Sequence, residues 1–510
     1  MRLRASRLTL CALFWALASG AVSAQSAEQS AGRYLDSIRN QPSLLLAFLH
    51  DMPKGGDLHN HLDGAIYAED LIDFAVSDNL CVDRTTSQLI APPCDPSCEK
   101  YTSKPAIQCA YGDHVLYNQI VDAWSMRNWK PGDESGHDHF FATFDKFGMA
   151  SRDHVAEAVA TVINRAASEH VDYIEFMHTA DGGAAPRLAI KLGWNPDFAR
   201  MREDLLAGGL KEVAAATSKS LAEDDAKAHK ELKCGTPQAE PGCNITVRYL
   251  YQVLRGLPPE AVFAQILLGF ELASSDPHFV GLNLVMPEDW YVPIHDFHLH
   301  MAMLDYLHGI YPQVHISLHA GEIAAGLVKP EDLSYHIRES VEKGHAERIG
   351  HGVSVMQERD PIGLLQELAA RSVLVEINLT SNDQILGVSG EEHPLPIYMK
   401  YGVPVAISTD DEGVARSDMT HEYLRAVESY RLPYTELKRM TRQSLEHSFL
   451  PGASLWAKTT NTFRPVVACE SDTVGGEKPS SGCAKFLAEN ERAREQWKLE
   501  SEFGKFEKKY

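Results

Sequence analysis

The sequence predicts an α/β protein whose main body is a (β/α)8 TIM barrel. Eight short runs rich in β-branched and aromatic residues recur along the chain, and each ends in polar residues or glycine. Stretches with the spacing of amphipathic helices lie between most of these runs. Alternating strands and helices form a parallel sheet, and eight such units are typical of a closed barrel. An open doubly wound sheet is the alternative.

The expected strands can be given in chain order by their sequences. They are "DLHNHLDG", "VDYIEFMH", "NITVRYLYQVL", "FVGLNLVM", "VHISLHAGE", "ERIGHGV", "VLVEINLTSN" and "VPVAISTDD". Apolar residues at helical spacing predict intervening helices over 153–170, 294–311, 332–345 and 362–372.

Residues 1–24 have the three parts of a secretory signal peptide. Arg2, Arg4 and Arg7 precede the apolar run "LTLCALFWALASGAV", and the small residues "VSA" end just before Gln25. The apolar run is short for a membrane span, and no later run is as apolar. We therefore expect a cleaved leader and a periplasmic or secreted protein without membrane attachment; an uncleaved anchor is the alternative.

Three segments depart from the strand and helix rhythm. We expect the barrel domain to span 25–460, with a disulfide-stapled insertion after the first strand at about 80–140. A charged helical insertion is expected at about 200–244. The polar stretch within 461–510 predicts a C-terminal helical extension that docks on the barrel or projects from it.

The cysteines predict disulfide bonds. Cys11 belongs to the leader, and the remaining eight are an even number in a chain expected to be exported. Cys234 is expected to pair with Cys243, and Cys469 with Cys483. Four more pair among themselves with their connectivity left open: Cys81, Cys94, Cys98 and Cys109. A cysteine zinc site is the alternative, but no second cysteine pair with matching spacing lies near Cys94 and Cys98.

The acidic charge argues against nucleic-acid partners. The formal net charge of −22 becomes about −25 once the arginines of the leader are removed. Binding of a polyanion rests on basic patches, and the one dense basic run is the C-terminal "KFEKKY". Phosphorylated small molecules are disfavoured too, because no lysine or arginine cluster accompanies the strand ends described next.

Histidines and carboxylates stand at the ends of four expected strands. The set comprises His59, His61, Asp63, His319, Glu322, His351, Asp410 and Asp411. Carboxyl ends of barrel strands meet at one rim, where active sites form, and alternate residues such as His59 and His61 point the same way. Burying these groups unpaired would cost several kcal/mol each. Nitrogen ligands with a carboxylate suit one Zn²⁺ per chain, with iron, cobalt or manganese as alternatives.

The motifs "LHNHLDGA", "SLHAGE", "RIGHG", "NLTSN" and "STDD", in this order, resemble the adenosine deaminase family of the metal-dependent amidohydrolases. The resemblance covers about residues 50–450. An exported chain with a cysteine-bearing insertion after the first strand is most similar to the extracellular, growth-factor-related branch. The resemblance implies hydrolytic deamination of adenosine, or of a 2′-deoxy or related 6-aminopurine nucleoside, to inosine and ammonia.

The resemblance also implies a role for each rim residue. Glu322 would protonate purine N1, and His351 would orient the zinc-bound water and help take its proton. Asp411 would hydrogen-bond N7, and Asp63 would meet a ribose hydroxyl. Zinc brings the pKa of a bound water to about 7, and protonation of N1 lets the ring accept the attacking oxygen. The zinc ligands would be His59, His61, His319 and Asp410.

The fourth expected strand departs from the family pattern Asp-Leu-x-Gly-x-Glu. In "NLVMPE", Asn283 stands in place of the aspartate and Met286 in place of the glycine whose backbone N–H meets purine N3. That N–H remains at Met286, but its side chain can reshape the pocket. We interpret "NLTSN" and Glu376 as core and turn, and the glycosylation-like matches at Asn244 and Asn378 as chance.

Two other functions remain open from the sequence. The same barrel and metal could act on another aminopurine, a modified nucleoside, or an ester or amide. An extracellular binding or signalling module could use the barrel as a scaffold. The oligomeric state is not fixed by the sequence, and a homodimer is left open.

Overall fold

The computed structural model describes residues 26–132, 134–459 and 462–510. The expected signal peptide lies outside the described residues. Eight parallel strands form one sheet, in the order in which they follow along the chain. They are β1 (Gly55–His61), β4 (Val171–His178), β5 (Thr246–Leu254), β6 (Phe279–Val285), β7 (His315–Ala320), β8 (Arg348–His351), β9 (Leu374–Ile377) and β10 (Val405–Ile407). The eight expected strands and their parallel arrangement are confirmed.

The sheet closes where β10 meets β1, next to a predicted metal ligand. The backbone N–H of Asp410 donates to the carbonyl oxygen of His59 (2.8 Å), and the N–H of His61 donates to the carbonyl oxygen of Asp410 (3.2 Å). Below this bridge, Asp57 accepts hydrogen bonds from Thr409. The open doubly wound sheet is therefore excluded, and the barrel prediction is confirmed.

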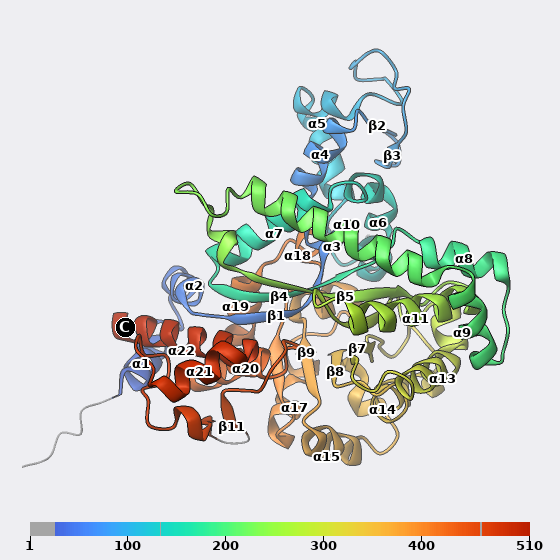
Figure 1. Ribbon diagram of the computed structural model, residues 1–510. Coiled ribbons are helices and arrows are strands. Elements are labelled where there is room, and N and C mark those ends of the chain that lie inside the picture. Colours follow the sequence, from blue (N-terminus) through green and yellow to red (C-terminus); the bar gives the residue numbers. More distant parts are fainter. Residues whose placement is uncertain (1–25, 133, 460–461) are drawn as a thin grey trace, which may run out of the picture.

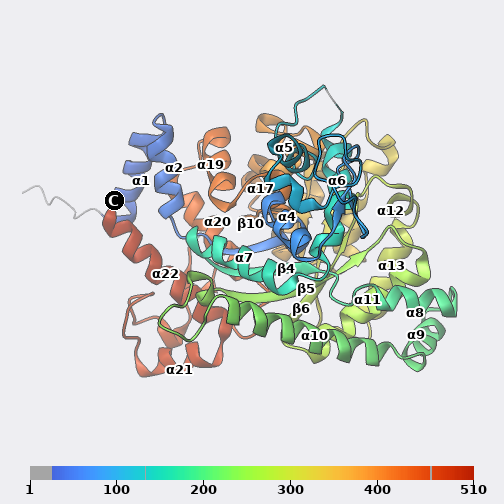
Figure 2. The same cartoon turned by 90° about the horizontal axis from the view of Figure 1, so that it is seen from above.

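Helices surround the strands (Figures 1 and 2). Those between or after the strands are α7 (Val155–Ser168), α8 (Ala184–Leu192), α11 (Pro259–Ser275), α12 (Tyr291–His295), α13 (Phe297–His308), α14 (His336–Glu342), α15 (Pro361–Arg371), α16 (Leu379–Leu386), α17 (Leu395–Tyr401), α18 (Glu412–Ala415), α19 (Met419–Tyr430) and α20 (Tyr434–Glu446). The helix expected over 294–311 is divided at Asp296 into α12 and α13. Apolar faces such as that of α11, which packs on β5 and β6, exclude water from the barrel wall.

The first insertion projects from one end of the barrel (Figure 1). Its elements are α3 (Leu62–Ala65), α4 (Ala68–Ser77), β2 (Cys81–Val82), β3 (Leu89–Ile90), α5 (His114–Ala123) and α6 (Gly136–Ser151). The four cysteines with open connectivity pair as Cys81–Cys94 and Cys98–Cys109. Two short disulfide loops thus fix an irregular segment, as the sequence predicts.

The second insertion consists of α9 (Phe198–Ala207) and the long helix α10 (Leu210–Glu231), and the Cys234–Cys243 disulfide follows them. Beyond the barrel, β11 (Trp456–Lys458) pairs with β12 (Arg464–Pro465), and α21 (Ser481–Glu489) precedes α22 (Glu491–Lys509). Cys469 pairs with Cys483 in a small separate core. Helix α22 docks beside α20 and the N-terminal helices α1 (Ala27–Ile38) and α2 (Pro42–Asp51).

In the part of the chain that the structure describes, no helix is both long and apolar enough to cross a membrane.

A buried arginine joins two carboxylates inside the barrel. Arg348 Nη2 donates to Glu175 (2.6 Å), and its Nε donates to Glu376 (2.7 Å); all three side chains are fully buried. Tyr173 and the backbone of Phe449 add hydrogen bonds to Glu175. Arg348 is the cation that both carboxylates share, and its loss would leave them without a charged partner, which is costly for buried carboxylates.

The variant Arg348→Met should therefore lose about 3–5 kcal/mol of unfolding free energy, because it leaves two buried carboxylates unpaired. Equilibrium denaturation by urea, followed by circular dichroism, measures the change. The control Arg200→Met removes an exposed pair with Asp204 and should change stability by less than about 1 kcal/mol. Equal losses in the two variants would contradict a structural role for the buried network.

Candidate metal centre and catalytic cavity

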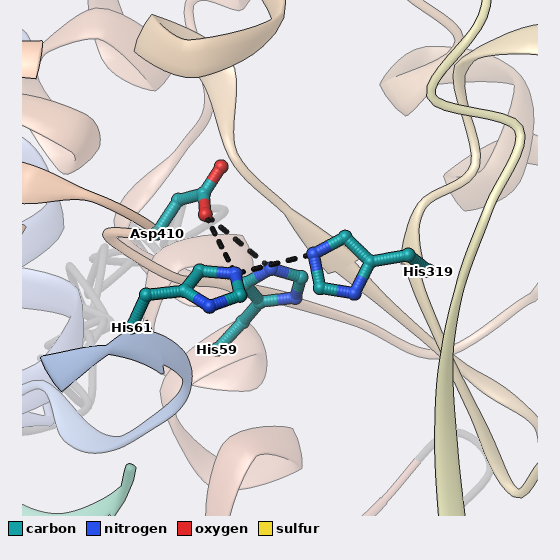
Figure 3. Close-up of side chains that lie close together, drawn as sticks. All are labelled: His59, His61, His319 and Asp410. Carbon is teal, nitrogen blue, oxygen red and sulfur yellow. Dashed lines mark hydrogen bonds and ion pairs between the residues drawn. The ribbon is translucent and has the colours of Figure 1, made fainter. Parts of the chain in front are cut away.

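The carboxyl ends of β1, β7 and the β10 segment bring three imidazoles and one carboxylate together (Figure 3). His59, His61, His319 and Asp410 each offer one ligand atom, and these atoms all lie within 4.8 Å of one another. Asp410 Oδ1 is 3.5 Å from His59 Nε2 and 3.3 Å from His61 Nε2. The four residues predicted as metal ligands, which come from three strand ends, thus meet at one point.

The Nδ1 atom of each histidine is held by an acceptor from another strand. His59 Nδ1 bonds Glu376 (2.7 Å), His61 Nδ1 bonds the side-chain oxygen of Gln252 (2.8 Å), and His319 Nδ1 bonds that of Asn283 (2.6 Å). Each of these oxygens must receive a hydrogen, so each Nδ1 carries the proton. The Nε2 atoms are left with lone pairs that point to the centre of the cluster.

The converging lone pairs fit a divalent cation. His61 Nε2 lies 3.2 Å from His319 Nε2 although neither atom has a proton to share, and His59 Nε2 is buried with no hydrogen-bond partner among the described residues. A cation between these nitrogens and Asp410 removes their repulsion. Three nitrogens and one carboxylate oxygen, with no thiolate, match the donors that zinc takes where a further position stays open to a small molecule.

Glu376 belongs to this centre, which corrects the interpretation of its strand as core and turn. Its carboxylate accepts hydrogen bonds from His59, Ser317 and Arg348. The sequence signal was a lone acidic residue within the apolar run "VLVEINL", but its partners lie on other strands. Asn283 orients a metal ligand: its side-chain oxygen accepts from His319 Nδ1, and its amide donates to Ser317 (3.3 Å).

Glu322 is positioned by a second carboxylate, Glu288, which the sequence reasoning missed. Glu288 accepts the backbone N–H groups of Gly321 (3.0 Å) and Glu322 (2.7 Å) and contacts His336 Nδ1. Burial opposes ionisation of Glu288, but the charges of His336 and Arg255 lower its pKa to about 2. Burial and the charges of Asp410 and Glu288 raise the pKa of Glu322 well above its usual value. One carboxylate is thus ionised and structural, while the other keeps its proton.

His351 is held as a neutral imidazole of one tautomer. Burial lowers its pKa to about 3. The backbone N–H of Leu395 donates to His393 Nδ1, so His393 Nε2 carries a hydrogen and donates to the Asn382 oxygen (3.0 Å). The Asn382 amide must then donate to His351 Nδ1 (2.9 Å). His351 therefore carries its proton on Nε2, which lies 3.8 Å from Asp410 Oδ2.

Asp63 belongs to the "LDG" turn, and Asp411 packs against Gly64 of the same turn. Asp411 is buried, and its Oδ1 has no hydrogen-bond partner within the described chain. Burial, with the charge of Asp410, raises the pKa of Asp411 well above its usual value, so that it can donate as a carboxylic acid. A Cβ at Gly64 would lie 1.7 Å from Asp411 Oδ1, so this turn requires glycine.

Met286 has a backbone conformation that favours glycine. Its φ is +93°, a left-handed conformation that side chains disfavour. Arg255 donates to its carbonyl oxygen, and its sulfur accepts the N–H of Gly256 at 3.2 Å. The side chain thus folds over Gly256, where a Cβ would clash with it. His351 (φ +67°) and Asp410 (φ +61°) are also left-handed at strand ends.

The cluster lies at the base of a catalytic cavity of about 520 Å³. All predicted site residues except His59 line this cavity, and His59 is fully buried beside them. Phe141 and Phe144 of α6 and Trp290 form an apolar wall, and His137 of α6 bonds Asp289 across the rim (2.9 Å). Among the described lining residues there is no lysine or arginine. The cavity has room for a nucleoside-sized molecule.

Comparisons with known proteins agree with this site. Residues 129–455 match the family model described as adenosine deaminase. The match includes His319, Glu322, His351, Asp410 and Asp411, whereas β1 with its two histidines precedes it. The chain is also similar to adenosine deaminases of Escherichia coli strains, with 39% identity over 137 residues. That segment is 27% of this chain and spans 38% of the relatives' length.

Two solved structures share the fold. An N6-methyl-AMP deaminase from Arabidopsis thaliana aligns with a TM-score of 0.50 and 19% identity, over 80% of this chain and 94% of that one. A zinc-bound amidohydrolase from Burkholderia ambifaria aligns with a TM-score of 0.51 and 16% identity, over 80% and 88%. At these identities the similarity shows a shared fold alone.

Gln252→Ala should weaken metal binding about 10- to 100-fold, because His61 loses the acceptor that fixes its ring. Competition with a chromogenic chelator measures the affinity of the purified protein for Zn²⁺. The control Gln366→Ala, at an exposed position of α15, should leave the affinity unchanged. Unaltered affinity in Gln252→Ala would contradict the assigned hydrogen bond.

Proposed function

The chain belongs to the adenosine deaminase family, and on this premise we propose that it hydrolyses adenosine, or its 2′-deoxy or a related 6-aminopurine nucleoside, to inosine and ammonia. One observation supports this most directly: the buried carboxyl group of Glu322 stands beside a cluster that fits a metal ion, where burial and the neighbouring carboxylates raise its pKa and favour the protonated form. A binding module has no use for a proton donor held beside metal ligands, whereas hydrolysis of an amidine requires one.

In the proposed complex, the purine lies with its reacting edge toward the metal cluster. Glu322 donates its proton to N1, the protonated Asp411 donates to N7, and the backbone N–H of Met286 donates to N3. Zinc held by the three histidines and Asp410 would supply a water acidic enough to react near neutral pH. Water adds at C6, one of its hydrogens passes to the departing nitrogen and the other restores the proton of Glu322, the C6–N6 bond breaks, and ammonia leaves. The balance is one water consumed for each inosine formed.

We assign His351 an orienting role. Its Nδ1 accepts from Asn382, so its Nε2–H can donate to the attacking water, but the neutral ring has no free lone pair with which to take a proton. This revises the part of the sequence-based role in which His351 also helps to remove the proton. Asn382 and His393 act through His351 and are positioning residues.

The cavity supports a nucleoside rather than a nucleotide as substrate. Phosphate groups are held by lysine, arginine or helix N-termini, and no described lining residue is lysine or arginine. The similar Arabidopsis protein is an N6-methyl-AMP deaminase, but the residues lining the catalytic cavity here offer no lysine or arginine for the phosphate of such a nucleotide. The similarity to bacterial adenosine deaminases supports the nucleoside.

We also propose that the protein is exported, to the periplasm or outside the cell, and that it belongs to the extracellular branch of the family. Four disulfides among the described residues support an oxidising compartment, and the leader-like N-terminus agrees. Its partner is then a free nucleoside, and the acidic charge remains unfavourable for nucleic acid.

Replacing Glu322 tests the proposed activity. The zinc-loaded wild type should deaminate adenosine, measured as loss of absorbance near the adenosine maximum and as ammonia release. Glu322→Gln cannot protonate N1, and its kcat should fall about 10²- to 10⁴-fold while its zinc content is retained. The control Glu331→Gln, at an exposed position in the same connection, should behave as wild type. Turnover unchanged in Glu322→Gln would refute the acid role, and a metal-loaded protein inert toward every aminopurine nucleoside would refute the function.

Met286→Gly tests the substrate orientation. Glycine tolerates φ +93° and removes the side chain beside purine N3, so purines substituted at C2 should be accepted better. The ratio of kcat/KM for 2-chloroadenosine to that for adenosine should rise about tenfold or more in this variant. Met356→Gly, in an exposed turn, should leave the ratio unchanged. An unchanged ratio in Met286→Gly would place N3 elsewhere.

A further inference from the structure

A second, larger cavity adjoins the catalytic cavity. It has a volume of about 1190 Å³ and lies among α6, α7, α10 and the β4–α8 connection. Asp63, Phe144 and Leu254 line both cavities, so the two spaces meet at these residues. The proposed reaction uses only the smaller one. We call the larger one the side cavity.

The inner wall of the side cavity carries carboxylates. Asp63, Asp181 and Asp224 are half-buried there, together with His178 at the end of β4. Asp181 accepts the N–H groups of Gly183 and Ala185, and Asp224 pairs with Lys227, whose side chain is 68% exposed. His178 Nδ1 is buried without a hydrogen-bond partner within the described chain. Asp181 and Asp224 already hold two backbone N–H groups and Lys227, so the wall offers a ligand the acceptor positions that these contacts leave unused.

The outer rim is balanced in charge. Arg152 and Arg187 stand there with Asp153 and Glu212, and all four are exposed. Exposed charges are screened by salt and contribute little to binding, whereas half-buried carboxylates act in a lower dielectric. The carboxylates of the inner wall therefore make this cavity favour a cationic ligand.

The bound nucleoside would point its sugar toward this cavity. In this orientation C6 faces the metal cluster, N1 faces Glu322 and N7 faces Asp411. The purine nitrogen N9, which carries the sugar, then faces away from them. Asp63 lies where the sugar-bearing side of the catalytic cavity opens into the side cavity. The exocyclic 5′ carbon is the part of a ribose that carries substituents farthest from the base, so a 5′ substituent would continue past Asp63.

We propose that the side cavity is a subsite for an ammonium group attached through the 5′ carbon of the nucleoside, so that a 5′-aminoalkyl adenosine is a better substrate than adenosine. The inference rests on the proposed deaminase function. The Asp224 carboxylate would accept the N–H groups of the ammonium, and the thioether or alkyl linker would pass Asp63 and lie along Phe144 and Leu254. Deamination at C6 proceeds as for adenosine, and the 5′ substituent is not changed.

Three matched probes test the subsite. They are adenosine 5′-thioethers whose 5′ sulfur carries a 3-aminopropyl, a butyl or a 2-carboxyethyl group. The kcat/KM of the aminopropyl probe should exceed that of the nearly isosteric butyl probe about tenfold or more, and the carboxyethyl probe should be the poorest of the three. Equal values for the aminopropyl and butyl probes, or a preference for the carboxylate, would overturn the proposal.

Two variants test whether Asp224 of the inner wall causes the preference for the ammonium group. Asp224→Asn should lower the aminopropyl-to-butyl ratio about fivefold, each ratio being measured within one variant. The neighbouring Glu223→Gln, on the same helix with its side chain 61% exposed, should leave the ratio unchanged. A ratio that is insensitive to Asp224→Asn would overturn the assignment of the cation to this wall.

Turnover of adenosine distinguishes the failure of the subsite proposal from the failure of the proposed deaminase function. Turnover of adenosine without a preference for the aminopropyl probe would refute the subsite and keep the deaminase function. A protein that turns over no nucleoside would refute the function, and calorimetric affinities of the zinc-loaded protein for the three probes would still decide whether the wall binds an ammonium group.

Discussion

The closure of the barrel and the geometry of the metal centre depend on the same two hydrogen bonds. The backbone of Asp410 lies between the backbones of His59 and His61, accepting from one and donating to the other. Any shift of the last strand against the first would move the carboxylate away from the imidazoles. The side chain of Asp57, bonded to Thr409, supports this seam from below. A ligand set drawn from distant parts of the chain thus becomes rigid when the sheet closes.

Beneath the centre, the barrel interior is polar rather than apolar. Arg348 joins Glu175 to Glu376, and Glu376 in turn holds His59. Buried ion pairs of this kind add little net stability, because desolvation offsets the attraction. Here they fix the protonation of the metal ligand: Glu376 keeps its charge, so His59 keeps its proton on Nδ1 and its Nε2 stays available to a cation. Neighbouring charges also keep Glu288 ionised, whereas burial and the adjacent carboxylates favour the protonated form of Glu322.

The sequence predicts those parts of the fold and site that follow from local pattern. Strand ends, helix spacing and the order of motifs identify the barrel and the histidines and carboxylates at the base of the cavity, because carboxyl ends of parallel strands share one rim. Gln252 and Glu288 were not singled out, and Glu376 and Asn382 were interpreted as core and turn, since each acts through a neighbour on another strand or loop. Asn283 was noticed only as a departure from a pattern. The pairing of the first four cysteines likewise required three-dimensional proximity.

Every disulfide closes a loop of 9 to 14 residues within one of the segments that lie outside the eight strands. No such bond ties one barrel strand to another in the described chain. Oxidation is therefore separable from barrel assembly, because no cysteine has to react before the strands that carry the metal-binding residues can pair. Production in a reducing host would then impair the insertions and the C-terminal extension first, while the metal-binding cluster still assembles.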